Sequence, residues 1–233
     1  VATLMGAGSH IVSSSALYGG SHNLLHYTMS RFGIETTFVH PHDIDGWRKA
    51  VRPNTKLFFG ETVGNPGLDV LDIPTVSQIA HEAGVPLLVD STLTSPYLLK
   101  PFDLGADLLY HSATKFLSGH GTVIGGIVVD AGSFDWERSG KFPELSQSYE
   151  GFHNMVFSEE STVGAFLLRA RREAPRDADQ LLAADHPLAA VDGAEKGITY
   201  TTDTMHRVTV VGGKSDPRGA AAALLKDVLN IYR

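Results

Sequence analysis

A lysine, two hydroxyl residues and an aspartate have types and spacing that could carry out chemistry together. The segment LLYHSATK reads as a buried strand that ends in Ser112 and Thr114, with Lys115 directly after them. Asp90 ends an earlier apolar run, PLLVD. A lysine amine can form a Schiff base with an aldehyde, and its pKa falls when burial removes it from water. We therefore expect Lys115 at the closed, desolvated end of a site.

The other strand ends supply groups that suit a flat, phosphorylated cofactor. Ser112, Thr114 and nearby backbone N–H groups could bind a phosphate. Asp90 could pair with a protonated ring nitrogen, and Tyr18 could stack on an aromatic ring. Together with Lys115 these groups form a cradle for pyridoxal 5′-phosphate, which supplies an electron sink. Taken singly, each has a simpler reading, such as a helix cap for Asp90 and a packing role for Tyr18.

Asn65 and Glu61 follow another predicted strand, in GETVGNPG. Ligands of open parallel sheets bind beyond the carboxyl ends of the strands, so these side chains can converge with Asp90 and Lys115. The sequence Asn-Pro-Gly at 65–67 is also a good β-turn that needs no further role.

The elements that position these residues alternate between strand and helix. Apolar runs predict strands at 10–15, 35–39, 56–61, 86–90, 107–112 and 125–130, and helical periodicity or helix signals predict helices at 21–33, 43–51 and 72–84. This order predicts an α/β fold with a mostly parallel sheet and helices on both faces. Residues 131–154 read as a long polar and aromatic loop, 160–174 as a helix, and 176–233 as a small, incomplete α/β part with a strand at 206–213 and a helix at 217–232. We expect a cofactor-binding domain over 1–160 and an atypical C-terminal segment over 161–233.

Composition excludes several classes of protein. The net charge is −7, and the short basic run at 169–172 is too small to indicate nucleic-acid binding. The chain contains no cysteine, which excludes disulfides, thiolate metal sites and a cysteine nucleophile. No apolar run is long enough to predict a membrane span, and no signal peptide is recognised, so we expect a cytoplasmic protein without a membrane partner. Because the chain starts at Val1, we expect it to be a fragment.

The stretch LLVDSTLTSPYLLKPFDLGADLLYHSATKFLSGHG resembles the central motif of the Cys/Met-metabolism family of pyridoxal-phosphate enzymes, of fold-type I. The resemblance covers roughly residues 1–170. It implies that Lys115 binds the cofactor aldehyde and that Asp90 pairs with the pyridine nitrogen. It also implies that Ser112 and Thr114 contact the phosphate, that Tyr18 stacks over the ring and assists proton transfer, and that Asn65 and Thr92 lie near the cofactor's 3-oxygen.

Two short loops, GHGTVIGG and DWERSGKFP, are most similar to the O-acetylhomoserine sulfhydrylase branch of this family. That similarity implies replacement of the acetate of O-acetyl-L-homoserine by sulfide or a small thiol, in methionine biosynthesis, by a dimer or tetramer. The family's N-terminal phosphate-binding parts and its C-terminal arginine for the substrate carboxylate are not recognised here, and Ser91 replaces the usual asparagine. We therefore expect phosphate binding and substrate anchoring to be incomplete in these 233 residues.

Three other interpretations stay open. A sister enzyme, such as O-succinylhomoserine sulfhydrylase, cystathionine γ-synthase or methionine γ-lyase, would share the same cofactor residues. A folded remnant without cofactor is a second possibility. A metal hydrolase is the third, because His22 and His26 are spaced by four residues and His40 and His42 by two. Neither histidine pair is completed by a carboxylate at a recognised zinc spacing, so we predict no metal site.

Overall fold

The structure is a computed structural model, and it describes residues 1–119, 121, 124–160, 164–173, 195–202 and 206–214. The chain divides into two compact units, Val1–Ala174 and Pro175–Arg233. The division at residue 160 that the sequence suggests concerns the roles of the domains and stays a prediction.

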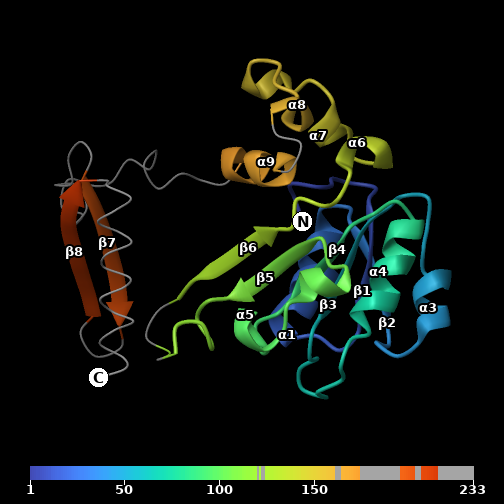
Figure 1. The fold of residues 1–233 in the computed structure, drawn as a ribbon, viewed down its shortest axis with the longest axis horizontal. Helices are drawn as coiled ribbons and strands as arrows, with labels where there is room; N and C mark the ends of the chain where they lie inside the picture. Colours follow the sequence, from blue (N-terminus) through green and yellow to red (C-terminus); the bar gives the residue numbers. More distant parts are fainter. Residues whose placement is uncertain (120, 122–123, 161–163, 174–194, 203–205, 215–233) are drawn as a thin grey trace. The chain divides into compact units, whose positions relative to one another are not determined.

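A sheet of six strands forms the centre of the first unit, in the order β2-β1-β3-β4-β5-β6 (Figure 1). Strands β1 to β5 pair in parallel, and β6 pairs antiparallel to β5 at one edge. The bounds of the strands are β1 His10–Ser14, β2 Glu35–Val39, β3 Thr55–Glu61, β4 Leu87–Asp90, β5 Leu108–Ser112 and β6 Gly126–Asp130. The predicted α/β class and all six predicted strands of this unit are confirmed.

Apolar side chains alternate between the two faces of the sheet and pack into two separate hydrophobic cores. Ile11 and Phe59 belong to one core, while their chain neighbours Val12 and Phe58 belong to the other. This alternation with a period of two residues is what buries both faces of a parallel sheet. Helices therefore have to cover both faces, as the sequence predicts.

Helices α3 (Ile44–Lys49) and α4 (Ile73–Glu82) cover one face, with Trp47 and Val76 fully buried. The other face is covered by a continuous helical run and by helices that follow the sheet in sequence. The run comprises α1 (Gly19–Asn23), η1 (Leu24–Thr28) and α2 (Met29–Arg31), and the later helices are α6 (Trp136–Ser139), α7 (Pro143–Ser146), α8 (Phe157–Glu160) and α9 (Ala165–Glu173). Short helical turns α5 (Ser95–Leu98), η2 (Pro101–Leu104) and η3 (Glu150–Phe152) complete the unit.

The prediction of a loop over 131–154 is wrong, because short helices form there. Asp135 caps α6 by accepting a hydrogen bond from the N–H of Arg138 at 2.9 Å. Trp136, Phe142 and Leu145 are almost fully buried in the core beneath. Each helix is only one turn long, so no helical period shows in the sequence, and the buried aromatic residues hold the segment in place.

In the second unit the described residues form two antiparallel strands, β7 (Glu195–Thr202) and β8 (His206–Lys214). Strand β8 coincides with the strand predicted at 206–213. The helix predicted at 217–232 lies outside the described residues. No helix within the described ranges is both long and apolar enough to cross a membrane.

Candidate active site

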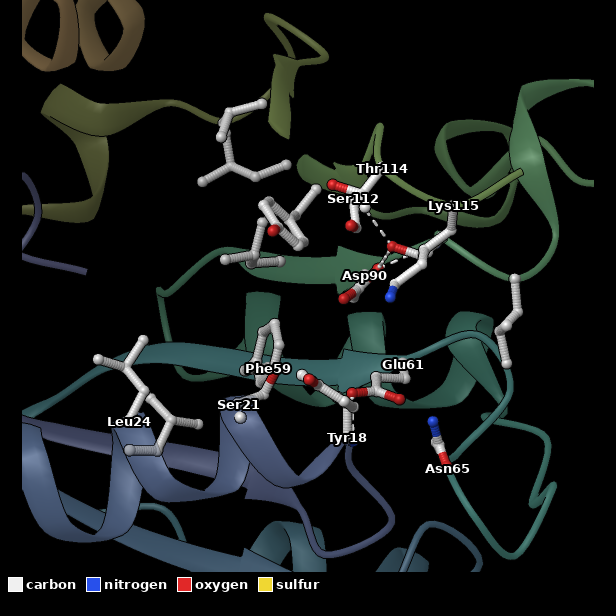
Figure 2. Close-up of a pocket in the computed structure, with 18 of the residues that line it drawn as sticks. Tyr18, Ser21, Leu24, Phe59, Glu61, Asn65, Asp90, Ser112, Thr114 and Lys115 are labelled. Carbon is white, nitrogen blue, oxygen red and sulfur yellow. Dashed lines mark hydrogen bonds between the residues drawn. The ribbon is translucent and has the colours of Figure 1, made fainter. Parts of the chain in front are cut away.

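A cavity of about 1120 Å³ opens at the carboxyl end of the sheet in the first unit. Every second residue near the ends of three neighbouring strands lines it, because these side chains lie on one face of the sheet. They are Phe59 and Glu61 on β3, Asp90 on β4, and Tyr110 and Ser112 on β5. The structure brings all the residues predicted for the site to this cavity: Tyr18, Asn65, Asp90, Thr92, Ser112, Thr114 and Lys115. Figure 2 shows Asp90 and Lys115 pointing into the same space that Tyr18 and Glu61 border.

Thr92 fixes the orientation of Asp90. The backbone N–H and the hydroxyl of Thr92 both donate to Oδ1 of Asp90, the first at 2.9 Å. The Thr92 oxygen in turn accepts a hydrogen bond from the backbone N–H of Ser112 at 2.8 Å. One carboxylate oxygen is thereby held by the loop after β4, while Oδ2 has no hydrogen-bond partner among the described residues. Thr92 therefore contacts the aspartate that the sequence singled out and links it to the end of β5.

Keeping the Asp90 carboxylate charged costs free energy, because the side chain is buried. Only 8% of its surface is exposed. Burial raises the pKa of Asp90, while the two hydrogen bonds from Thr92 and the nearby His111 lower it. A cation at Oδ2 would offset the cost of burying this charge.

Lys115 lies in the turn after β5, and its side chain is exposed. The expectation that Lys115 is desolvated is therefore wrong for these residues. The backbone N–H of Lys115 donates to the carbonyl of Ser112 at 3.2 Å, so a tight turn carries the lysine past the end of the buried strand. The amine can still reach the cavity, which Lys115 lines.

Ser112 and Thr114 border the cavity beside this turn. The hydroxyl of Thr114 accepts from the N–H of Gly125 at 3.1 Å, and so holds the turn against the start of the next strand. The Ser112 hydroxyl makes no hydrogen bond to any described residue, and it is therefore available for a ligand.

The cavity contains two further residues: Glu61, which the sequence placed at this rim without a role, and Tyr110, which it did not single out. Glu61 is 7% exposed, and it accepts a hydrogen bond from the backbone N–H of Tyr18 at 2.6 Å. Tyr110 pairs in register with Asp90, and burial and then Asp90 raise the pKa of its phenol. The alternation of Leu108, Tyr110 and Ser112 could have indicated that Tyr110 shares the face of Ser112. The contact between Glu61 and Tyr18 joins residues 43 apart and leaves no local signal.

The histidines do not gather into a metal site within the described part of the chain. His22 and His26 stack with ring centroids 5.4 Å apart, and His22 also stacks on Phe38. His40 and His42 contact each other edge to face on the exposed surface. Aromatic packing accounts for the first pair, as the simpler reading of the sequence suggests.

The fold and the cavity define a class: α/β proteins with a lysine and an aspartate lining a cavity at the carboxyl end of a mostly parallel sheet, where ligands of open sheets bind. A model of the family described as Cys/Met metabolism PLP-dependent enzyme matches residues 1–170. The chain belongs to that family.

Several similar proteins are named for reactions of O-acetylhomoserine. The chain is 49% identical to O-acetyl-L-homoserine sulfhydrylase of Leptospira meyeri over 179 residues, which are 73% of this chain and 40% of that protein. Its structure matches O-acetylhomoserine sulfhydrylase of Wolinella succinogenes with a TM-score of 0.64 at 37% identity, over 74% of this chain and 46% of that one. It also matches a protein of Campylobacter jejuni proposed to be O-acetylhomoserine (thiol)-lyase, whose structure contains pyridoxyl-lysine monophosphate, with a TM-score of 0.68 at 27% identity over 73% of this chain and 43% of that one.

The chain spans less than half the length of these relatives. Its last part matches something else: a model of the homoserine dehydrogenase family covers residues 177–229. The sequence-based reading of 161–233 as an atypical segment of the sulfhydrylase family did not anticipate this second match.

Proposed function

We propose that residues 1–174 bind pyridoxal 5′-phosphate and that the protein catalyses γ-replacement on O-acetyl-L-homoserine. In this reaction sulfide or a small thiol takes the place of acetate and gives homocysteine or methionine. The single observation that carries the proposal is the convergence of Lys115, Asp90, Ser112 and Tyr18 on one cavity in a chain of this family.

The geometry of Asp90 fits the cofactor. Asp90 is buried, and Thr92 fixes its Oδ1 atom while Oδ2 has no partner among the described residues. Its own strand, β4, contains no lysine or arginine. A carboxylate in this state is suited to pair with a protonated pyridine nitrogen. The charged hydrogen bond would offset the burial that raises the pKa of Asp90. When bound, the cofactor supplies an electron sink that acidifies the α-proton of an amino acid.

The other residues would bind, orient and move protons around that ring. Lys115 would hold the aldehyde carbon through Nζ. Once released, Nζ would take the α-proton and pass it on, then take a β-proton as acetate leaves from Cγ, and both carbons would regain a proton after the sulfur nucleophile has added at Cγ. The free hydroxyl of Ser112 would contact the phosphate, and Thr114 would shape the turn that surrounds it. Tyr18 would cover one face of the ring, and Asn65 would border its 3-oxygen side.

A homo-oligomer, either a dimer or a tetramer, and a cytoplasmic location are part of this proposal, as they are of the prediction from the sequence. The small-molecule partners are the amino-acid ester and the sulfur nucleophile, and neither nucleic acid nor membrane is required.

Borohydride trapping tests the proposal. The full chain, incubated with pyridoxal 5′-phosphate and reduced, should carry a phosphopyridoxyl group on the peptide that contains Lys115. The Lys115→Ala variant should lose this label, while Lys100→Ala, which removes a lysine outside the cavity lining, should keep it. A wild-type chain that stays unlabelled, or is labelled only elsewhere, would contradict cofactor binding at this site.

Substrate assays separate this reaction from those of sister enzymes. We expect acetate release from O-acetyl-L-homoserine to depend on sulfide or a thiol. Preference for O-succinyl-L-homoserine with cysteine, or release of methanethiol from methionine, would assign the protein to another branch of the family.

A further inference from the structure

Glu61 is a buried acidic residue of the cavity to which the proposed reaction assigns no role. It ends β3, pairs in register with Asp90 on β4, and lines the same cavity. Two carboxyl groups on adjacent strands repel each other, and burying either one costs free energy unless hydrogen bonds compensate. The contacts that Glu61 makes therefore indicate what it does.

The carboxyl group of Glu61 holds the backbone of Tyr18. Its Oε1 atom accepts the hydrogen bond from the Tyr18 N–H at 2.6 Å, across 43 residues of sequence. Burial raises the pKa of Glu61 to about 7, and Asp90 adds to this, whereas the bond from Tyr18 lowers it. The hydrogen bond thus favours the charged, stronger acceptor.

The loop after β3 makes a second contact with the same segment. A Cβ atom added to Gly64 would lie 2.7 Å from the Cβ of Ala16 and 2.9 Å from its carbonyl oxygen. The glycine therefore allows this loop to lie directly against the residues that precede Tyr18.

The side chain of Tyr18 is only partly packed: 54% of its surface is exposed, and one side of its ring lies against Gly20. Tyr18 occupies the N-cap of α1 without a side-chain cap bond. The position of the ring therefore depends largely on the anchoring of its backbone. To this anchoring Glu61 contributes the one hydrogen bond from outside the local helix among the described residues.

We propose that Glu61 is a positioning residue, which acts with Gly64 to hold the Tyr18 segment at the cavity so that the tyrosine ring covers a flat heterocyclic ligand. The identity of that ligand rests on the proposed function. The anchoring of Tyr18 by Glu61 does not depend on the proposed function, because the hydrogen bond between them forms without any ligand.

Amide hydrogen exchange tests the anchor without cofactor. In Glu61→Ala the exchange of the Tyr18 amide should accelerate about tenfold, because its acceptor is lost. Glu61→Gln keeps an acceptor oxygen, so its exchange should stay within about threefold of the wild type. Glu144→Ala removes a partly buried carboxylate that pairs with Lys56 outside the cavity lining, and should leave the Tyr18 amide unchanged.

Pyridoxal 5′-phosphate titrations of the full chain test the consequence. Glu61→Ala should weaken binding about tenfold, and Gly64→Ala should weaken it similarly while keeping the acid. In a Tyr18→Ala background, Glu61→Ala should have no further effect, because the ring it positions is gone.

Unchanged exchange in Glu61→Ala, or an equal loss of affinity with and without the Tyr18 ring, would overturn the role of Glu61. A wild-type chain that binds no cofactor would contradict the proposed function instead, and the exchange experiment would still decide whether Glu61 anchors Tyr18.

Discussion

Thr92 connects three positions of the candidate site through a single hydroxyl oxygen. It donates to Asp90 and accepts from the N–H of Ser112. Thr92→Val keeps the shape but leaves the Ser112 N–H without an acceptor, so we expect the free energy of unfolding to fall by about 1–3 kcal/mol. Urea denaturation measures this change.

The conservative variant supplies the control for Thr92. Thr92→Ser keeps the hydroxyl and should lose well under half as much stability. Equal losses in the two variants would show that the methyl group, rather than the hydrogen bonds to Asp90 and Ser112, stabilises this loop.

Glu61 should make the stability of the cofactor-free protein depend on pH. Its folded-state pKa is about 7, above the ordinary value of 4.5, so the folded state binds the proton more tightly than the unfolded state. Stability attributable to this group is present below about pH 4.5 and is lost as pH rises through about 7. Glu61→Gln removes the titration, and its stability relative to wild type should therefore increase by about 3 kcal/mol from low to high pH.

Thermal and urea unfolding at several pH values measure this difference. The wild-type and Glu61→Gln stability curves should run parallel below about pH 4.5, separate between about pH 4.5 and 7, and keep a constant difference above that. Curves that stay parallel over the whole pH range would mean that Glu61 keeps an ordinary affinity for protons in the folded state.

At the residue scale, the sequence predicts which residues meet but not how they are surrounded. Asp90, Ser112 and Lys115 could be placed at one edge because parallel strands end together there. The exposure of Lys115 could not be predicted, because it depends on the conformation of the turn after β5. The contact of Glu61 with Tyr18 depends on tertiary structure alone.

At the scale of elements, α4 shows what local signals can specify. Asp72 accepts from the N–H of Thr75 at 3.2 Å at its start, and Gly84 adopts a φ of +69° after its end. Both limits were predicted because a cap and a left-handed glycine act within a few residues. Helix α6 escaped prediction because its stability comes from Trp136, which is buried in a core assembled from distant segments.

A charged contact joins α4 to the start of β5. His81 lies 2.8 Å from the buried Asp107, whose carboxylate also accepts from the N–H of Leu87 at 2.8 Å. The hydrogen bond to Asp107 raises the pKa of His81 above 6.5. This contribution to stability is fully present below pH 6.5 and is lost as pH rises through the folded-state pKa.

His81→Gln should therefore lose stability at pH 6 more than at pH 9. Because the histidine side chain is 44% exposed, solvent screening limits the difference to roughly 0.5–1 kcal/mol. Chemical denaturation at both pH values measures it, with Gln78→Ala on the same helix as a control that carries no titrating group. A loss that is equal at both pH values would assign His81 a packing role only.

At the scale of the whole molecule, the chain combines matches to two families. The first unit belongs to the Cys/Met metabolism PLP-dependent enzymes, and residues 177–229 match homoserine dehydrogenase. Composition and periodicity could not reveal the second match, since the segment 176–233 is only weakly patterned. All the residues assigned to the candidate site lie before residue 174.

A chain that ends at Ala174 should therefore retain the site. The first unit contains both hydrophobic cores and every described residue that lines the cavity. We expect residues 1–174 to unfold cooperatively, with a melting temperature within a few degrees of the corresponding transition in the full chain, and to bind pyridoxal 5′-phosphate with an affinity within about twofold. Calorimetry and cofactor titration measure both quantities. A truncated chain that folds but no longer binds the cofactor would show that residues after 174 contribute to the site, and the assignment of cofactor binding to the first unit would have to be abandoned.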